Sequence, residues 1–161
     1  MEIGRLFRHA VTGSWILGRY FPHSVMQAIH QAIVESEKMH SAEICFVVES
    51  QMSLLSVLRG TNGRDRAIEV FAEDRVWDTK RNNGVLIYLL LADRDIEFVL
   101  DRGAAHIDTK EICRKLEAAC RAGQFESGVC EAITALGILL SKAFPPKEDD
   151  VDEVKNTIRR S

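Results

Sequence analysis

Two apolar runs near the middle of the chain form its clearest pattern of hydrophobic and polar positions. The segments GVLIYLLLA (84–92) and IEFVLD (96–101) are rich in leucine, β-branched and aromatic side chains, and Asp93-Arg94-Asp95 separates them. Runs this apolar are typical of strands that are covered on both faces, and so short a polar connection favours an antiparallel hairpin. The pattern therefore predicts two neighbouring strands inside a sheet.

Helical periodicity and a third apolar run precede this hairpin. Val25, Ile29 and Ile33 recur at helical spacing, so a helix is expected from Ser24 onward. The run EICFVVES follows, and it is too apolar for a strand with one solvated face. We therefore expect the first main strand at 43–49.

Three further helices are predicted around the hairpin. One follows the turn signal at 61–63 and ends near Asp74, a second begins at the capping-box-like pair Asp108 and Glu111, and a third runs over 126–144 and ends before two prolines. Helices that alternate with covered strands predict an α/β protein. The expected fold is a three-layer α/β/α sandwich, in which helices cover both faces of a small mixed sheet.

The chain divides into one domain and two flanking segments. The predicted domain covers 22–146, with an N-terminal extension at 1–21 and a charged C-terminal tail at 147–161. The tail is expected to be solvated or to form a frayed extra helix, because its composition is mostly charged and polar. No internal repeat divides the domain further.

The N-terminal extension mixes apolar and basic side chains. It is expected to pack on the domain as a helix, with an amphipathic membrane anchor as the alternative, since Phe7 and Trp15 accompany Arg5, Arg8 and Arg19. Its most apolar piece, WILGRYF, is far shorter than the ~20 residues of a membrane helix, and no signal-peptide pattern is present. We therefore expect a cytoplasmic protein without a transmembrane segment.

Composition excludes a general attraction to nucleic acid. The 161 residues are 46% hydrophobic and 28% charged, and the formal net charge is -3, whereas phosphate binding needs clustered Lys and Arg. The four cysteines show no CxxC spacing and lie within apolar patterns, so they are expected to be free core thiols in a reducing setting. A zinc site built from Cys113, Cys120 and a histidine is the unspecific alternative.

Four segments of the chain resemble those of a known family. The segments AEICFVVE, NNGVLIYLLL, DRG and AGQFESGVCEAITALGILLSKAFP, in this order, resemble the TPM-domain family over about 22–146. The chain looks most like its short soluble bacterial members. The resemblance implies an α/β/α fold, divalent-cation binding near the strand-flanking loops in some relatives, and a proposed acid phosphatase activity. In that subgroup, the helix that follows DRG often carries a Trp. This chain has EICRKL there, which would remodel one wall of the cleft.

Polar residues border the predicted hairpin at its open end. Asp78, Asn82 and Asn83 precede the first strand of the hairpin, and Asp101 ends the second. Because the two ends of an antiparallel hairpin lie side by side, these residues are expected to share one cleft. Carboxylate and amide oxygens are the ligands that calcium or magnesium prefers, so the sequence predicts a weak divalent-cation site. The alternative is that they serve turn geometry and ion pairs, and bind nothing.

Other polar residues give weaker signals. Arg64 and Arg66 could orient a phosphate near the acidic rim, but an ion pair of Arg66 with Glu69 along a helix is the favoured interpretation. Glu43 and Glu49 lie at the ends of the first strand, where polar residues are common. The five histidines stand in no metal or triad motif, and neither a nucleophile motif nor a phosphate loop is present.

The sequence thus favours a non-catalytic module that uses an acidic rim cleft to bind a divalent cation or an unidentified protein partner. A metal-assisted acid phosphatase acting on phosphomonoesters is the alternative, with an ion at Asp78 and Asp101 polarising the phosphoryl oxygen. Hydrolysis would require a second ion or a dedicated base, and the sequence identifies neither.

Overall fold

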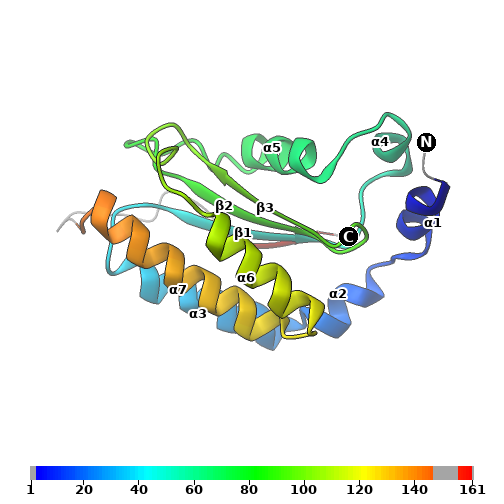
Figure 1. Ribbon diagram of the computed structural model, residues 1–161, viewed down its shortest axis with the longest axis horizontal. Helices are drawn as coiled ribbons and strands as arrows, with labels where there is room; N and C mark the ends of the chain where they lie inside the picture. The colour runs from blue at the N-terminus through cyan, green and yellow to red at the C-terminus, as the bar shows by residue number, and fades with distance from the viewer. Residues whose placement is uncertain (1–2, 147–155, 161) are drawn as a thin grey trace.

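The structure is a computed structural model that describes residues 3–146 and 156–160. Its described elements occur in the order α1 (Ile3–Val11), α2 (Trp15–Tyr20), α3 (His23–Glu37), β1 (Ile44–Glu49), α4 (Leu54–Leu58), α5 (Gly63–Glu73), β2 (Val85–Leu90), β3 (Asp95–Leu100), α6 (Lys110–Arg121), α7 (Phe125–Ala143) and β4 (Thr157–Arg160). Figure 1 shows α5 on one face of the sheet and α3, α6 and α7 on the other. The α/β fold with its two helical layers confirms the predicted architecture.

The sheet is mixed, with the strand order β3-β2-β1-β4. β1 runs parallel to β2, with Ile44 opposite Val85. β2 and β3 form the predicted antiparallel hairpin, in which Val85 lies opposite Leu100. β1 and β2 are therefore central, and every residue of both strands is buried.

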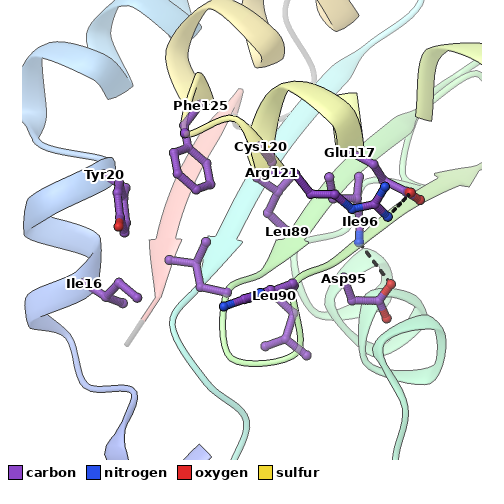
Figure 2. A pocket seen from close by; sticks show the side chains of 13 residues that line it. Ile16, Tyr20, Leu89, Leu90, Asp95, Ile96, Glu117, Cys120, Arg121 and Phe125 are labelled. Carbon is purple, nitrogen blue, oxygen red and sulfur yellow. Dashed lines mark hydrogen bonds and ion pairs between the residues drawn. The ribbon is translucent and has the colours of Figure 1, made fainter. Parts of the chain in front are cut away.

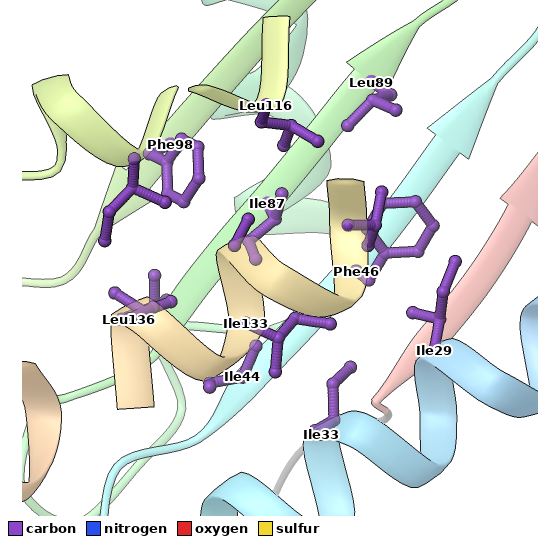
Figure 3. Close-up of a cluster of buried hydrophobic side chains, with 14 of the residues drawn as sticks. Ile29, Ile33, Ile44, Phe46, Ile87, Leu89, Phe98, Leu116, Ile133 and Leu136 are labelled. Atoms are coloured by element: carbon purple, nitrogen blue, oxygen red, sulfur yellow. The ribbon is translucent and has the colours of Figure 1, made fainter. Parts of the chain in front are cut away.

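Alternate side chains of the central strands enter two separate cores. The larger core places Phe46 and Ile87 against Ile29 of α3, Leu116 of α6 and Ile133 of α7, as Figure 3 shows. The smaller core lies under α5 and contains residues of the opposite strand faces. Burying one such large side chain stabilises the fold by ~1.5–3 kcal/mol. This two-sided burial explains why the strands read as continuous apolar runs rather than as alternating patterns.

The start of α5 follows the local sequence, whereas the start of α6 differs from the prediction by one residue. Asn62 caps α5 by accepting from the backbone N–H of Asp65, and the Asp65 side chain accepts from the backbone of Asn62, so a capping box closes this end. The predicted cap of α6 is displaced by one residue. Thr109 is its N-cap, while Asp108 accepts from the backbone N–H of Lys110 at 3.0 Å.

The N-terminal extension packs on the domain, as the favoured interpretation expected. Leu17 and Phe21 are buried in the larger core, and Leu6 packs against the smaller one. Arg5 donates to Asp93 at 2.7 and 2.9 Å, and the buried His9 accepts from the backbone N–H of Met52 at 3.0 Å. These contacts anchor α1 beside the β2–β3 turn. In the described part of the chain, no helix has the length and hydropathy to cross a membrane.

The C-terminal segment corrects one expectation. A solvated tail or a frayed helix was predicted after residue 146, but 157–160 form the edge strand β4, which runs parallel to β1. The carbonyl of Asn156 accepts from the backbone N–H of Phe46 at 2.8 Å, and the Asn156 side chain donates to Glu37 at 2.8 Å. The open edge of β1 supplies backbone partners, so a short polar segment can become a strand without an apolar pattern of its own. Residues 147–155 of the predicted tail lie outside the described residues.

Candidate functional site

The predicted rim is where β2 begins and β3 ends, and its loops are held together by backbone contacts. The amide of Asp101 donates to the carbonyl of Gly84 at 2.9 Å, and that of Gly103 donates to the carbonyl of Asn82 at 2.7 Å. Asn82 has a φ of 51°, the left-handed conformation that asparagine tolerates better than most residues. A Cβ at Gly103 would lie 2.7 Å or less from the carbonyl oxygens of Arg81 and Asn82. The two loops therefore meet backbone to backbone.

Asn83 anchors this loop to the domain. Its side chain is buried and its Nδ2 donates to the carbonyl of Ser41, while its backbone N–H donates to the hydroxyl of Thr79 at 3.0 Å. Arg81 reinforces the same junction by donating to the hydroxyl of Ser41, and its guanidinium lies 5.5 Å from the ring centre of Phe144. Asn83 thus holds the loop in place through its amide nitrogen.

Arg102 links Asn82 and Asp101 by donating a hydrogen bond to each. The Asn82 Oδ1 accepts from the Arg102 guanidinium at 2.9 Å, and the Asp101 Oδ1 accepts from the backbone N–H of Arg102 at 2.7 Å. Asp101 is 6% exposed, and its second oxygen, Oδ2, is buried without a hydrogen-bond partner. A carboxylate oxygen withdrawn from water without a partner costs free energy. Asp101 therefore brings unused binding capacity to the rim.

Asp78 belongs to the same end of the sheet, but its side chain is exposed. Its backbone N–H donates to the carbonyl of Arg75 at 2.9 Å, which places it in the turn after α5. The carbonyl of Val76, two residues earlier, lies where a Cβ of Gly84 would stand. The structure thus brings Asn82, Asn83 and Asp101 into one contiguous cluster and leaves Asp78 on the surface beside it.

The rim is not a preformed acidic cage. Within residues 3–146 and 156–160, no three His, Cys, Asp or Glu side chains are grouped so that they could hold a metal ion. A cation at Asp101 would take its remaining ligands from amide and backbone carbonyl oxygens or from water. Such a site suits a hard cation that accepts many oxygen ligands, calcium above all.

A buried charged network that the sequence did not predict lies under α5. Arg66 donates to both oxygens of Glu49, at 2.8 and 3.1 Å, and also pairs with Glu69 and Glu73 at 3.0 Å each. The hydroxyl of Tyr88 donates to Glu49. The hydrogen bond to Glu49 raises the pKa of Arg66, and burial, followed by the charge of Glu49, raises the pKa of Tyr88. The predicted pair of Arg66 with Glu69 is confirmed, and its contact with Glu49 is new.

Arg64 and Arg66 both make their contacts away from the rim. Arg64 donates to the carbonyl of Phe98 at 2.6 Å and pairs with Glu97 at 3.3 Å. Arg66 is bound to Glu49 at the opposite end of β1 from the rim. The contacts therefore do not support the interpretation in which one of these arginines orients a phosphate beside Asp78.

A pocket lies at the far end of the hairpin from the rim, where β2 ends and β3 begins (Figure 2). Its volume is about 390 Å³, and its walls come from α2, the hairpin and the α6–α7 turn, with Tyr20, Leu89 and Phe125 among the apolar side chains. Arg121 and Glu117 form an ion pair at 3.0 Å in its wall. This pocket was not predicted, because the periodicity of a sequence does not show where a core opens.

The titratable groups in the pocket wall do not form a nucleophilic centre. Burial raises the pKa of the Cys120 thiol to about 11, so this thiol is protonated near neutral pH and is a poor nucleophile. Burial also raises the pKa of Asp95, whose carboxylate is turned toward Gly63 at the start of α5. The pocket offers apolar contact and an ion pair to a ligand, and we assign it no chemistry.

Comparisons with known proteins agree with the architecture and the loops described above. The family model of the TPM domain matches residues 19–138, which is more than half of the chain. The NMR structure of the BA42 protein from the psychrophilic bacterium Bizionia argentinensis is similar at a TM-score of 0.72 and 30% sequence identity, over 86% of this chain and 93% of that one. Among the curated proteins, no match was found. The matched segment contains the hairpin, both rim loops, the helices α3, α5 and α6 and most of α7, and this chain therefore belongs to the TPM-domain family.

Proposed function

We propose that this protein is a non-catalytic binding module that takes a divalent cation, with calcium preferred, at the rim formed by 78–84 and 101–103. The observation that carries the proposal is the buried Asp101 Oδ2, which has no hydrogen-bond partner. A cation beside this oxygen would offset the cost of its burial, whereas the neighbouring Arg102 side chain is directed to Asn82.

The ligand set explains why affinity should be low. Asp101 would supply the charged ligand, and the loop would supply carbonyl oxygens. Asp78 could add a second carboxylate from the exposed turn. Asn83 would hold the loop through its contact with Ser41 rather than through the ion. A site with one or two carboxylates and no complete cage is expected to bind calcium at about 10⁻⁴ to 10⁻³ M.

Binding rather than hydrolysis is supported by the arginine contacts. Phosphoryl transfer depends on cationic groups that stabilise charge on the transferred group. Arg64 and Arg66 are engaged with Glu97 and Glu49, away from the rim. The guanidinium groups at the rim are also engaged, Arg102 with Asn82 and Arg81 with Ser41. The phosphatase alternative is separated from our proposal by a turnover assay. Hydrolysis of a generic phosphomonoester that is lost in Asp101→Asn would favour the enzyme.

Calcium titration followed by melting temperature tests the proposal. At 10 mM calcium and a dissociation constant of about 1 mM, mass action stabilises the folded state by ~1.4 kcal/mol. For a domain of this size, that corresponds to an increase of roughly 3–6 °C in melting temperature. Asp101→Asn should abolish the increase and Asp78→Asn should reduce it, while Glu131→Gln, an exposed change on α7, should retain it. An equal increase in Asp101→Asn would refute the site.

A further inference from the structure

Large apolar side chains gather on the exposed faces of α1 and α4 and at the start of α2. Helices α1 and α4 pack together at one end of the molecule, where Figure 1 shows them beyond the ends of the strands. We name this the α1–α4 surface, and its exposed apolar residues are Ile3, Phe7, Val11, Trp15, Leu54, Leu55 and Leu58. Ile3, Phe7 and Trp15 are the most open, at 76%, 66% and 64% exposure.

The exposure follows from how α1 is anchored. Leu6 and the buried His9 face the domain, and Arg5 is held by Asp93. Ile3 and Phe7, four residues apart on the helix, consequently lie on the other face. In α4, Val57 is the buried residue, and the three leucines around it remain exposed.

This concentration differs from the rest of the described surface. The other large exposed apolar side chains there are Met39, Ile68, Trp77 and Ile138, which come from four separate segments. Apolar residues scattered singly are ordinary on a protein surface, whereas large exposed ones gathered on two helices that pack together mark an interaction site.

The charges around the α1–α4 surface have one predominant sign. The segments 3–21 and 50–62 contain Arg5, Arg8, Arg19 and Arg59 and no Asp or Glu, although the whole chain has a formal net charge of -3. Asp93, from the β2–β3 turn, pairs with Arg5 and lies 3.6 Å from Arg8. Four arginines against this one aspartate leave these segments with an excess of positive charge.

We propose that the α1–α4 surface binds the surface of an anionic lipid bilayer, with α1 lying in the plane of the interface. An apolar helix face with flanking arginines and an exposed Trp is the composition that binds at the boundary of headgroups and acyl chains. A second copy of the chain is the less suitable occupant, because a twofold contact would place the arginines of one copy against those of the other. The α1 helix has nine residues, so it lies on a bilayer and does not span one.

Co-sedimentation with vesicles tests this proposal. The wild-type protein should sediment with phosphatidylglycerol vesicles and much more weakly with phosphatidylcholine vesicles. Phe7→Asp should lower the partition constant by roughly 30-fold or more, since one buried aromatic side chain is lost and a charge must enter the interface. Ile138→Asp, on the exposed face of α7, is the matched control and should bind like the wild type. Both positions are exposed, so circular dichroism should show folded protein in each case.

The arginines and Trp15 provide two independent readouts. Arg19→Gln with Arg59→Gln should weaken binding to the anionic vesicles by roughly tenfold or more, since each cation near such a surface contributes about fivefold. In a Trp77→Phe background, the fluorescence of Trp15 should shift to the blue when phosphatidylglycerol vesicles are added. In a Trp15→Phe background, the exposed Trp77 should show no shift.

Three results would overturn the proposal. Absence of wild-type binding to phosphatidylglycerol vesicles at millimolar lipid would do so, as would equal binding by Phe7→Asp. The third is a dimer of the wild-type protein, measured by light scattering, that Phe7→Asp converts to a monomer, because this result would assign the α1–α4 surface to a second copy of the chain.

Discussion

Acidification should destabilise this protein through His40, a buried histidine after α3. His40 is 1% exposed, its Nδ1 lies 3.0 Å from the carbonyl of Ala42, and its Nε2 lies 3.0 Å from the hydroxyl of Ser36. Burial lowers the pKa of His40 from 6.5 to about 4, while the hydrogen bond to Ala42 acts in the opposite direction. The folded protein therefore keeps this ring neutral at a pH where the unfolded chain would protonate it.

The sign and size of the effect follow from proton linkage. Above pH 6.5 the ring is neutral in both states, and the stability is fully present. Between pH 6.5 and about 4 the unfolded state binds the additional proton, so the free energy of unfolding falls as the pH falls. The loss is about 2 kcal/mol between pH 7 and pH 5, and about 3 kcal/mol by pH 4.

Urea denaturation at a series of pH values measures this loss. Carboxylates also titrate in acid, so the contribution of His40 is the difference between the wild type and His40→Asn, whose amide can still donate to Ala42. The variant should be less stable at pH 7 by about 1–2 kcal/mol, because the contact with Ser36 is lost. It should then lose about 2 kcal/mol less than the wild type on moving to pH 5.

The exposed His106 supplies the matched control. His106→Asn repeats the same substitution at a surface position that lies outside the contacts of His40 with Ser36 and Ala42. If His40→Asn and the wild type lost the same stability between pH 7 and pH 5, the buried neutral state of His40 would be refuted.

Two further predictions concern the network under α5 and the rim. Arg66→Met should cost about 3–5 kcal/mol by urea denaturation, because it leaves the buried Glu49 without its bidentate partner; adding Glu49→Gln should recover part of that cost, and a cost below 1 kcal/mol for Arg66→Met would contradict the network. Gly84→Ala should cost about 1–3 kcal/mol, because the new methyl group would collide with the carbonyl of Val76. Gly18→Ala on α2, where a Cβ meets nothing within 4 Å, should be neutral or stabilising in the same assay.

Local sequence specified the elements of this fold that rest on short-range chemistry. The hairpin was predictable because both apolar runs and the charged turn between them lie within 84–101. The start of α5 was predicted from the turn signal at 61–63, where the structure shows Asn62 and Asp65 forming a capping box within one turn. In both cases the interacting groups are neighbours in the chain, so their chemistry can be read in order.

The candidate site was predictable only in its location. The hairpin geometry placed Asn82, Asn83 and Asp101 at one end of the sheet, because antiparallel strands return to their starting edge. The roles of these residues came from partners elsewhere in the chain. Asn83 is bound to Ser41, 42 residues away, and Asn82 to Arg102, 20 residues away. No local pattern records such contacts, so turn residues and ion ligands look alike in the sequence.

The sequence alone thus determined the fold class, because the spacing of apolar residues dictates which elements form and how many faces of the sheet are covered. Tertiary structure decided which polar groups find partners. It turned the polar segment 157–160 into an edge strand, joined Arg66 to Glu49 beneath α5, and left Asp101 Oδ2 buried without a hydrogen bond. It also decided that Phe7 faces outward while Leu6 is directed to the core. These outcomes depend on which distant backbone or side chain arrives at a given place, and only the packed chain fixes that.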